Sequence, residues 1–344
     1  SGKLPELDWN AIPFGENLAS RNASANILGY LAQHIGNMIV SSADLANSDK
    51  TDGFLKKTRA IVPGDFGGQF IHAGVAELTM AALMNGIALH GGCIAACGTF
   101  FVFSDYIKPA LRMSALMKLP VKYVFSHDAF RVGEDGPTHQ PIEQEAQVRL
   151  LEIMNNLDGK MSTLVLRPAD SAETLESWKM AMENQGSPTV LIFSRQNLED
   201  VPPITGNRFE EAHGTVHGGY TVLGVDNPEA VLIANGSEVT LLVKVGMELN
   251  KEGYRVNVVS VPSVGLFTRQ PKEYRDSVLL PGVPRFALTA GLEATMYPLM
   301  KGTADWEIYA LNRFGASAPY KVLDEKFGYT FDNILSQVKA FIGK

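Results

Sequence analysis

Long apolar runs alternate with amphipathic stretches over the first two hundred residues of the chain. The runs are rich in β-branched and aromatic residues, which favours strands, and the clearest are VKYVF (121–125), STLVLRP (162–168) and TVLIF (189–193). A helix is predicted directly after Asp170, because the residues that follow have the spacing of one helical face: Leu175, Trp178 and Met182. Strands without polar alternation, separated by helices, predict a parallel sheet with helices on both of its faces.

A second series of strands and helices follows a polar segment rich in proline and glycine. After this segment, AVLIAN (230–235) leads through Gly236 and Ser237 into the helical stretch 238–253, and further strands are predicted at 255–262, 285–291 and 306–312. The fold class is therefore α/β, with two domains built on parallel or mixed sheets that carry helices on both faces. The predicted division is 1–14 as a polar tail, 15–198 as the first domain, 199–218 as a linker and 219–344 as the second, smaller domain.

The composition is that of an ordinary globular protein, and it excludes only a few functions. Of the 344 residues, 45% are hydrophobic and 19% are charged. The formal net charge of −7 argues against a nucleic-acid groove, which needs clustered Lys and Arg. No apolar run approaches the ~20 residues that span a bilayer. Neither nucleic acid nor a membrane is therefore expected as a partner.

The two cysteines, Cys93 and Cys97, are too few for a structural zinc site, and no metal site is predicted in this chain. They are expected to be free thiols in a reducing cytoplasm. The chain opens with Ser-Gly-Lys, without an initiator Met or a signal peptide, so residue 1 is not expected to be the natural start.

Polar residues gather directly after the strands of the first domain. In parallel α/β sheets, ligands bind at the carboxyl ends of strands, where loops and helix N-termini converge. Three strand ends favour a site for an anionic ligand, and the residues are His127 and Asp128, Arg167 and Asp170, and Arg195 and Asn197. For Arg167 and Asp170, a structural ion pair at the start of a helix is the preferred interpretation.

One carboxyl lies in an unusually apolar segment, residues 71–91. A helix is predicted there from about Val75, and it would place Glu77 on one face with Met80, Ala81 and Met84. A carboxyl desolvated among such neighbours can keep its proton at neutral pH and donate it. The alternative is that Glu77 lies near solvent at the helix start, where the helix dipole favours an acid.

Aromatic residues open the segment GTFFVFSDYIKPALRMSALMK (98–118), which is predicted as a strand followed by a helix. Phe101 and Phe103 would alternate on one face of the strand, and Phe100 would point to the other. Composition alone favours core packing for these rings.

Four segments together closely resemble transketolase: GDFGGQFIHAGVAELTMAALMNGIALHGG, GTFFVFSDYIKPALRMSALMK, SHDAFRVGEDGPTHQPIEQ and SRQNL. The second domain agrees with the family through YTVLG, ANGSEV and FGASAPY, and the similarity runs from about Leu18 to the C-terminus. The resemblance implies the thiamine diphosphate-binding fold followed by the transketolase C-terminal domain.

The resemblance covers only the second half of a transketolase, its pyrimidine-binding and C-terminal domains. The Gly-Asp-Gly motif with which the family's first domain grips the diphosphate and a divalent metal is absent from this sequence. The chain is therefore expected to be a fragment or one subunit of a split enzyme, with Mg or Ca held by the missing N-terminal domain. The family also implies a homodimer that holds the cofactor at its interface, and an isolated chain that does not turn over.

Two groups of site residues follow from the resemblance. Glu77, in GVAEL, resembles the catalytic glutamate that hydrogen-bonds the aminopyrimidine ring and promotes proton removal from the thiazolium carbon. The other residues that resemble cofactor-binding positions are Phe100, Phe103, Tyr106 and Asp44. The residues that resemble a clamp for the substrate phosphate are Arg21, Ser48, His127 and Arg195, and guanidinium forks suit such an anion.

The loop VGEDGPTHQP (132–141) resembles the family's substrate-reading loop. Asp135 is expected to bond a substrate hydroxyl and so select the sugar, and His139 to assist proton transfer at the reacting end, with Glu134 in a supporting role. By itself the loop is more typical of a solvated turn than of a site. The sequence departs from the family beside this loop, where Phe130 and Arg131 would add bulk and a cation to the site, and at Ala76.

The implied reaction is reversible transfer of a two-carbon ketol unit from a ketose phosphate to an aldose phosphate, as in the pentose phosphate pathway. Three alternatives remain: deoxyxylulose-phosphate synthase, a 2-oxo-acid dehydrogenase beta subunit, and a non-catalytic assembly subunit. GEDGPTHQP and SRQNL weigh against the dehydrogenase, and the retained set of Glu77, Asp135 and His139 weighs against loss of catalysis.

Overall fold

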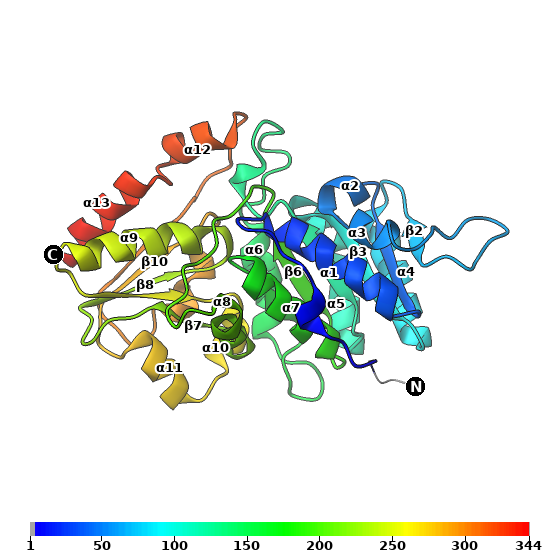
Figure 1. The fold of residues 1–344 in the computed structure, drawn as a ribbon, viewed down its shortest axis with the longest axis horizontal. Helices are drawn as coiled ribbons and strands as arrows, with labels where there is room; N and C mark the ends of the chain where they lie inside the picture. The colour runs from blue at the N-terminus through cyan, green and yellow to red at the C-terminus, as the bar shows by residue number, and fades with distance from the viewer. Residues whose placement is uncertain (1–3, 344) are drawn as a thin grey trace.

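The computed structural model describes residues 4–343, which form two α/β domains lying side by side (Figure 1). The first domain is built on a six-stranded sheet with the order β2-β1-β3-β4-β6-β5, and every strand pair in it is parallel. Its strands are β1 (Met38–Ser42), β2 (Phe70–His72), β3 (Ile94–Phe100), β4 (Lys122–Ser126), β5 (Leu164–Leu166) and β6 (Thr189–Phe193).

Helices cover both faces of this sheet, as expected for parallel strands. On one face, α1 (Ser20–His34) and α7 (Ser171–Glu183) pack through a core that includes Ile27, Leu31 and Trp178. On the other face, the core of Met80, Leu111 and Val148 comes from α4 (Glu77–His90), α5 (Ser104–Met117) and α6 (Gln144–Ile153). The short elements of the domain are η1 (Trp9–Ala11), α2 (Ala46–Asp49), α3 (Asp52–Leu55), η2 (Phe101–Phe103) and η3 (Phe130–Val132).

The second domain has a mixed five-stranded sheet with the order β11-β10-β8-β9-β7, in which only β7 pairs antiparallel. The strands are β7 (Tyr220–Leu223), β8 (Ala230–Ala234), β9 (Val256–Ser260), β10 (Arg285–Leu288) and β11 (Trp306–Tyr309). One core includes α9 (Val239–Lys251) and α13 (Phe331–Ile342), and the other includes α10 (Val264–Thr268) and α11 (Lys272–Leu279). The remaining elements are η5 (Gly236–Glu238), η6 (Glu293–Thr295), η7 (Tyr297–Leu299) and α12 (Tyr320–Phe327).

The predicted fold class, two α/β domains on parallel or mixed sheets with helices on both faces, is confirmed. The segment 199–218 between the sheets contains α8 (Arg208–Glu211) and η4 (Ala212–His217), and η4 contacts α7. None of the helices within residues 4–343 is long and apolar enough to cross a bilayer.

Two local predictions are wrong. Helix α4 begins at Glu77 rather than near Val75, because Gly74 has a positive φ and the Ala76 N–H bonds its carbonyl in a tight turn. The strand at 94–100 ends at Phe100, and the next three residues form η2, so Phe101 and Phe103 do not alternate on a strand. Phe101 is buried in the core against Phe125, at 5.6 Å between ring centroids.

The carboxyl ends of β8, β9 and β10 face the first domain. After β8, the Gly236 N–H donates to the Arg167 carbonyl at 3.1 Å, and after β9 the Pro262 carbonyl accepts from the Arg167 N–H at 2.9 Å. Beyond β10, the Leu292 N–H donates to the Ile142 carbonyl at 3.3 Å. The edge of the second sheet that would ordinarily hold a ligand is therefore covered by the first domain.

Buried charges join the domains along this edge. The Arg167 guanidinium, which is 1% exposed, donates to Asp128 and Glu238 at 2.7 Å each. The predicted pair between Arg167 and Asp170 is wrong, because Asp170 caps the start of α7 through the Glu173 N–H and pairs with Arg208 at 2.6 Å. The strand-end arginine thus points into the second domain, away from the helix that follows it.

Candidate active site

A pocket of about 570 Å³ opens at the carboxyl ends of β1 and β3. It is lined by Ala43, Asp44, Leu45, Val75, Glu77, Phe103 and Tyr106. The Glu77 side chain is largely buried, at 8% exposure, although it is the first residue of α4. The two sequence interpretations of Glu77 therefore both hold in part: it starts the helix, and apolar neighbours still desolvate it. Asp44 is exposed beside it, with a φ of 64°.

Aromatic rings form a continuous wall from this pocket toward β4. The rings of Phe100 and Phe103 are nearly parallel with centroids 6.0 Å apart, and the Phe103 and Tyr106 centroids are 6.1 Å apart. Phe100 also stacks on the His127 imidazole at 3.6 Å. Tyr106 is 60% exposed, so the wall ends at the surface of the first domain. Phe103 and Tyr106 line the pocket, and Phe100 continues the wall behind them.

A cationic cluster lies next to the stacked His127. The Arg21 Nη1 donates to the Ser48 carbonyl at 2.7 Å and lies 3.4 Å from His127 Nε2. Arg195 follows β6 and makes no hydrogen bond or ion pair with any part of residues 4–343, and Arg21 Nε is buried without a partner there. Burial and the nearby Arg195 lower the pKa of the Arg21 guanidinium. Two adjacent guanidiniums with unfilled donors suit an anion.

His127 is held neutral between these groups. Burial, followed by the charges of Arg21 and Arg195, lowers its pKa to about 2. With Nε2 facing the Arg21 donor, the other ring nitrogen is the one left to donate, and it lies 2.8 Å from the Ser126 hydroxyl. The residue has a φ of 65°, a conformation that L-residues rarely adopt, directly after β4.

The loop that follows η3 brings His139 to the aromatic wall. The His139 ring meets Phe103 edge-on at 5.4 Å between centroids, and its Nδ1 lies 2.8 Å from the Thr138 hydroxyl. Asp135 and Glu134 are both exposed at the turn of the loop. The structure thus brings His139, the aromatic wall and the cationic cluster together, while the Asp135 carboxylate has no partner among residues 4–343.

A buried carboxyl near Arg21, that of Asp49, was not predicted from the sequence. Asp49 Oδ2 accepts from the Ser42 hydroxyl at 2.7 Å, and Oδ1 accepts from the Thr51 N–H and hydroxyl at 2.9 and 2.7 Å. Burial raises the pKa of Asp49 to about 6. The only signal in the sequence is an acid flanked by hydroxyl residues in SSADLANSDKT, and that pattern is also typical of an exposed turn.

The expected effect of Phe130 and Arg131 on the site is wrong. Both side chains are buried against the second domain, where Phe130 packs on Tyr329 at 5.0 Å between centroids. The Arg131 guanidinium is bound by Glu238 and Asp324 at 2.7 Å each. Neither side chain lines the pocket, because the turn of η3 directs both toward α12.

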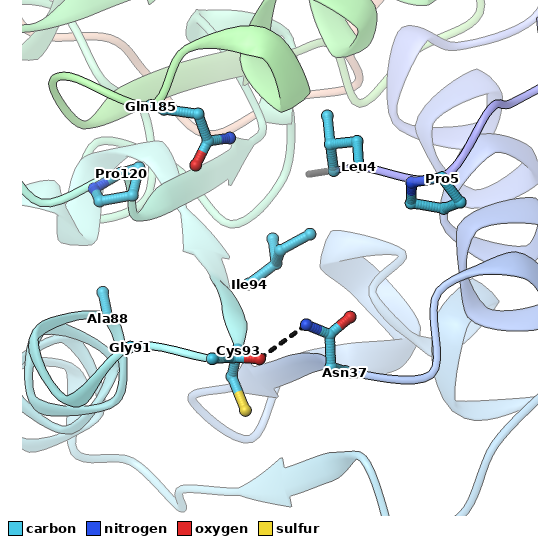
Figure 2. Close-up of a pocket in the computed structure, with 10 residues that line it drawn as sticks. Leu4, Pro5, Asn37, Ala88, Gly91, Cys93, Ile94, Pro120 and Gln185 are labelled. Atoms are coloured by element: carbon cyan, nitrogen blue, oxygen red, sulfur yellow. Dashed lines mark hydrogen bonds between the residues drawn. The ribbon is translucent and has the colours of Figure 1, made fainter. Parts of the chain in front are cut away.

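A second pocket, of about 220 Å³, lies at the opposite edge of the first sheet (Figure 2). It is lined by residues that precede or begin strands, such as Asn37 and Ile94, and by the Cys93 segment. Asn37 Nδ2 donates to the Gly92 carbonyl at 2.6 Å there. Cys93 and Cys97 are both free, as predicted, and burial raises the pKa of Cys97. None of the predicted site residues lies in this pocket.

Two family descriptions match the chain. "Transketolase, pyrimidine binding domain" matches residues 16–201, and "Transketolase-like TK C-terminal domain" matches residues 218–330. The Geobacillus stearothermophilus transketolase is 43% identical over 350 residues, covering 100% of this chain and 50% of that protein. The Bacillus subtilis transketolase is 42% identical with the same coverage. The chain therefore spans about half the length of the curated relatives it matches.

Solved structures agree with the sequence matches. A transketolase from Leishmania mexicana superposes with a TM-score of 0.88 at 35% identity, covering 99% of this chain and 48% of that one. A structure described as a split gene transketolase, an inactive beta4 tetramer, has a TM-score of 0.71 at 23% identity. That alignment covers 95% of this chain and 99% of the other. At this identity the second likeness shows the fold alone.

Proposed function

Because the chain belongs to the transketolase family, we propose that it is the catalytic half of a thiamine diphosphate-dependent enzyme that moves a two-carbon ketol unit from a ketose phosphate to an aldose phosphate. One observation carries the proposal. A pocket with a desolvated carboxyl and an aromatic wall adjoins a cluster of cations with unfilled donors, through the stack of Phe100 on His127.

The pocket fits the aminopyrimidine half of thiamine diphosphate. Phe103 and Tyr106 offer ring faces to a flat heterocycle, and the Glu77 carboxyl offers a hydrogen bond to a ring nitrogen. Asp44 would bind the cofactor at the rim of the pocket, and Phe100 would hold the Phe103 ring in place by stacking on it. The chemistry that the cofactor supplies when bound is uptake of the electron pair released as the carbon–carbon bond next to a carbonyl breaks.

The diphosphate and its divalent metal do not fit this chain. Among residues 4–343, no three His, Cys, Asp or Glu side chains lie together in a way that would hold a metal ion. We therefore assign Mg or Ca and the diphosphate to an N-terminal transketolase domain, present as a separate subunit or as the rest of a longer chain. The split gene neighbour, which this chain matches over 99% of its length, is consistent with a subunit of this size.

The chain's own residues bind, orient and move protons. Glu77 would hold the aminopyrimidine and promote proton removal at the reacting carbon. The substrate phosphate would be bound by Arg21, Arg195 and Ser48, beside the neutral His127. Binding of the phosphate would fix the far end of the sugar. His139 has Nδ1 engaged by Thr138 and Nε2 without a partner among the described residues, so its Nε2 is available to a substrate hydroxyl.

Asp135 would read the stereochemistry of the sugar, because its carboxylate stands exposed on a loop whose other end carries His139. A site built to hydrogen-bond a substrate hydroxyl rejects the analogue that lacks it, since the polar group is then left unpaired. Glu134, the adjacent acid, contributes through its backbone carbonyl, which accepts from the Ser317 hydroxyl at 2.5 Å.

A homodimer is proposed through the outer face of α4 and α5. That face exposes large apolar side chains, namely Leu78, Leu83, Leu89, Met113, Leu116 and Met117. Large exposed apolar side chains on two helices in contact with each other favour an interaction surface. We propose that the complete enzyme is cytoplasmic. We also propose that the two domains span residues 15–198 and 219–344, with a linker at 199–218.

The test uses the chain combined with its N-terminal half, assayed for ketol transfer between sugar phosphates with added thiamine diphosphate. Glu77→Gln should lower kcat by roughly 10²- to 10⁴-fold, the usual contribution of a positioned acid or base. Glu183→Gln, at an exposed position on α7, is the matched control and should leave kcat unchanged. Turnover of Glu77→Gln within twofold of wild type would overturn the proposal.

The rival functions give different outcomes in the same assay. Decarboxylation of pyruvate without ketol transfer would favour deoxyxylulose-phosphate synthase or a 2-oxo-acid dehydrogenase. No turnover of either kind by the complete enzyme would favour an assembly subunit. The chain alone, with cofactor, should transfer no ketol units, and appreciable turnover would show that it needs no N-terminal partner.

A further inference from the structure

We propose that Arg131 is a positioning residue for the loop Gly133–His139, and that through its two ion pairs the C-terminal domain becomes part of the substrate site. The inference rests on the proposed function for the role of this loop. It differs from the sequence expectation for Arg131, which placed the cation beside the ligand.

The loop is attached to the C-terminal domain on the side away from the pocket. In Figure 1 the segment after β4 rises beside α12, and η3 contacts that helix. The Ser317 hydroxyl donates to the Glu134 carbonyl at 2.5 Å. Gln140 Nε2 donates both to the Gly133 carbonyl and to the Ala316 carbonyl, at 2.9 Å each. The loop is therefore bound to residues 316–317 at its tip and at its end.

The two segments approach each other closely at Gly136, where a side chain would be both crowded and strained. A Cβ added to Gly136 would lie 3.2 Å from the Ser317 Cβ, and Gly136 also has a φ of 76°. Within the loop, the Gly136 N–H donates to the Gly133 carbonyl at 3.1 Å and the His139 N–H donates to the Gly136 carbonyl at 3.0 Å. Two consecutive turns of this kind make a compact loop whose orientation depends on its anchors.

Arg131 is the anchor at the beginning of the loop. Its side chain is 7% exposed, with Nη1 2.7 Å from Glu238 Oε1 and Nε 2.7 Å from Asp324 Oδ1. The guanidinium lies 4.8 Å from the Phe130 ring centroid and 5.6 Å from that of Tyr329. A planar group bound through two different nitrogens and stacked on rings has one orientation, which a flexible ammonium would not reproduce.

The Glu238 carboxylate that binds Arg131 also belongs to a hydrogen-bond network that reaches the residue next to His127 in the cationic cluster. Arg167 donates to Glu238 and to Asp128 Oδ2 at 2.7 Å each. The Ser237 hydroxyl lies 2.8 Å from both carboxylates and can donate its single proton to either of them. Asp128 directly follows His127. Glu238, a buried carboxylate of the C-terminal domain, thus connects Arg131, near the start of the loop, with Asp128 through Arg167.

Such a network orients groups more than it stabilises the fold. Buried ion pairs recover little net stability, because desolvation offsets most of the Coulomb attraction. Only Val132 separates Arg131 from the loop, so a change in its guanidinium geometry shifts Asp135 and His139 relative to the pocket. A displacement of the order of 1 Å lowers reaction rates substantially when the group acts on substrate.

The experiment compares Arg131→Lys and Asp324→Asn with wild type in the complete enzyme. The first variant keeps the charge and loses the fork, and the second removes one of the two pairs without leaving an unpaired carboxylate. Glu325→Gln, exposed on the same helix, is the matched control. Two measurements are made: hydrogen exchange of the amides in 133–139, and kcat/KM for pairs of sugar phosphates that differ only at the hydroxyl that Asp135 is proposed to read.

Both variants should speed exchange in 133–139 and lower the discrimination between the two sugars roughly tenfold, the size of effect expected for a small misplacement, with exchange in α4 unchanged. A lowered melting temperature with wild-type exchange in the loop and wild-type discrimination would mean a purely structural role and would overturn the inference. Absence of ketol transfer by wild type would defeat the proposed function instead. Loop exchange decides the anchoring by itself in that case, and unchanged exchange in both variants would also overturn the inference.

Discussion

Each sheet has an edge formed by the carboxyl ends of its parallel strands, and the two edges differ in the groups that lie against them. At the first edge, Arg195 has no partner among residues 4–343, Asp135 is exposed, and a pocket of about 570 Å³ stands open. At the second edge, the space after β8 is filled by the Arg167 and Arg131 side chains of the first domain, and Glu238 is bound to both. A strand-end edge is therefore a ligand site only where no other part of the protein occupies it.

The charges at the two edges differ in the same way. The first edge collects cations without carboxylate partners, which favours an anionic ligand. At the second edge, Arg131 and Arg167 are each paired with two carboxylates, so neither guanidinium is left to bind an anion. Removal of a buried, paired guanidinium at the second edge should therefore lower the stability of the fold, and removal of an unpaired guanidinium at the first edge should weaken ligand binding.

The largest effect is expected for Arg167→Met at the second edge. This change leaves the Asp128 and Glu238 carboxylates buried without their shared guanidinium, which typically costs about 3–5 kcal/mol of unfolding free energy. Urea denaturation of the chain measures the loss. Lys118→Met, which breaks an exposed pair with Asp158, should cost less than about 1 kcal/mol. Equal losses for the two variants would contradict the contrast between the edges.

A smaller effect, with a defined pH dependence, is expected for Asp49→Asn at the first edge. Burial raises the folded-state pKa of Asp49 to about 6, so its contribution to stability is complete below about pH 4 and is lost as the pH rises through 6. The asparagine does not titrate. Its unfolding free energy, compared with wild type, should therefore rise by up to about 3 kcal/mol between about pH 4 and pH 7.5.

The pKa of Glu238 is shifted in the opposite direction from that of Asp49, so its contribution to stability has the opposite pH dependence. Burial acts to raise its pKa, but the guanidiniums of Arg167 and Arg131 outweigh burial and hold the pKa below its ordinary value. The stability it contributes is present above the pKa of the unfolded chain and is lost as the pH falls through the folded value. Denaturation series at several pH values should show Asp49→Asn gaining relative to wild type only on the alkaline side. A pH-independent difference would contradict the assignment.

Loss of one cation at the first edge should weaken ligand binding and leave stability unchanged. In the complete enzyme, Arg195→Met should raise KM for phosphorylated substrates roughly ten- to a hundredfold, since a hydrogen bond to a charged group contributes about 1.5–3 kcal/mol. Steady-state kinetics with phosphorylated and unphosphorylated sugars measure the effect. An equal loss on both substrates would mean that Arg195 does not bind the phosphate.

The smallest effect distinguishes the two adjacent acids of the loop. Asp135→Asn should change the preference between epimeric sugar phosphates by about 1 kcal/mol, the difference between a hydrogen bond to a charged acceptor and one to a neutral acceptor. Glu134→Gln should change neither preference nor kcat, because only its backbone carbonyl is bonded. Competition assays with the two epimers decide between them, and a reversed pattern would exchange their roles.

The repeating pattern of apolar runs was sufficient to predict both sheets and the helix after Asp170. These predictions depend on local periodicity, which every residue of a strand or helix contributes to. The end of β3 and the start of α4 were misplaced by a few residues, because the turn at Gly74 and the change of direction at Phe101 depend on packing. The site residues could be named only through the motifs of the family, since each one by itself also suits a turn or a core.

The sequence by itself determined the fold class, the order of the elements and the side chains available at each strand end. Only the tertiary structure decided which edge stays open, because that depends on how two separate sheets meet. Arg131 shows the reason. Its charge is evident in the sequence, but its partners Glu238 and Asp324 lie 107 and 193 residues further along the chain. No local pattern indicates that it points away from the substrate loop and into the second domain.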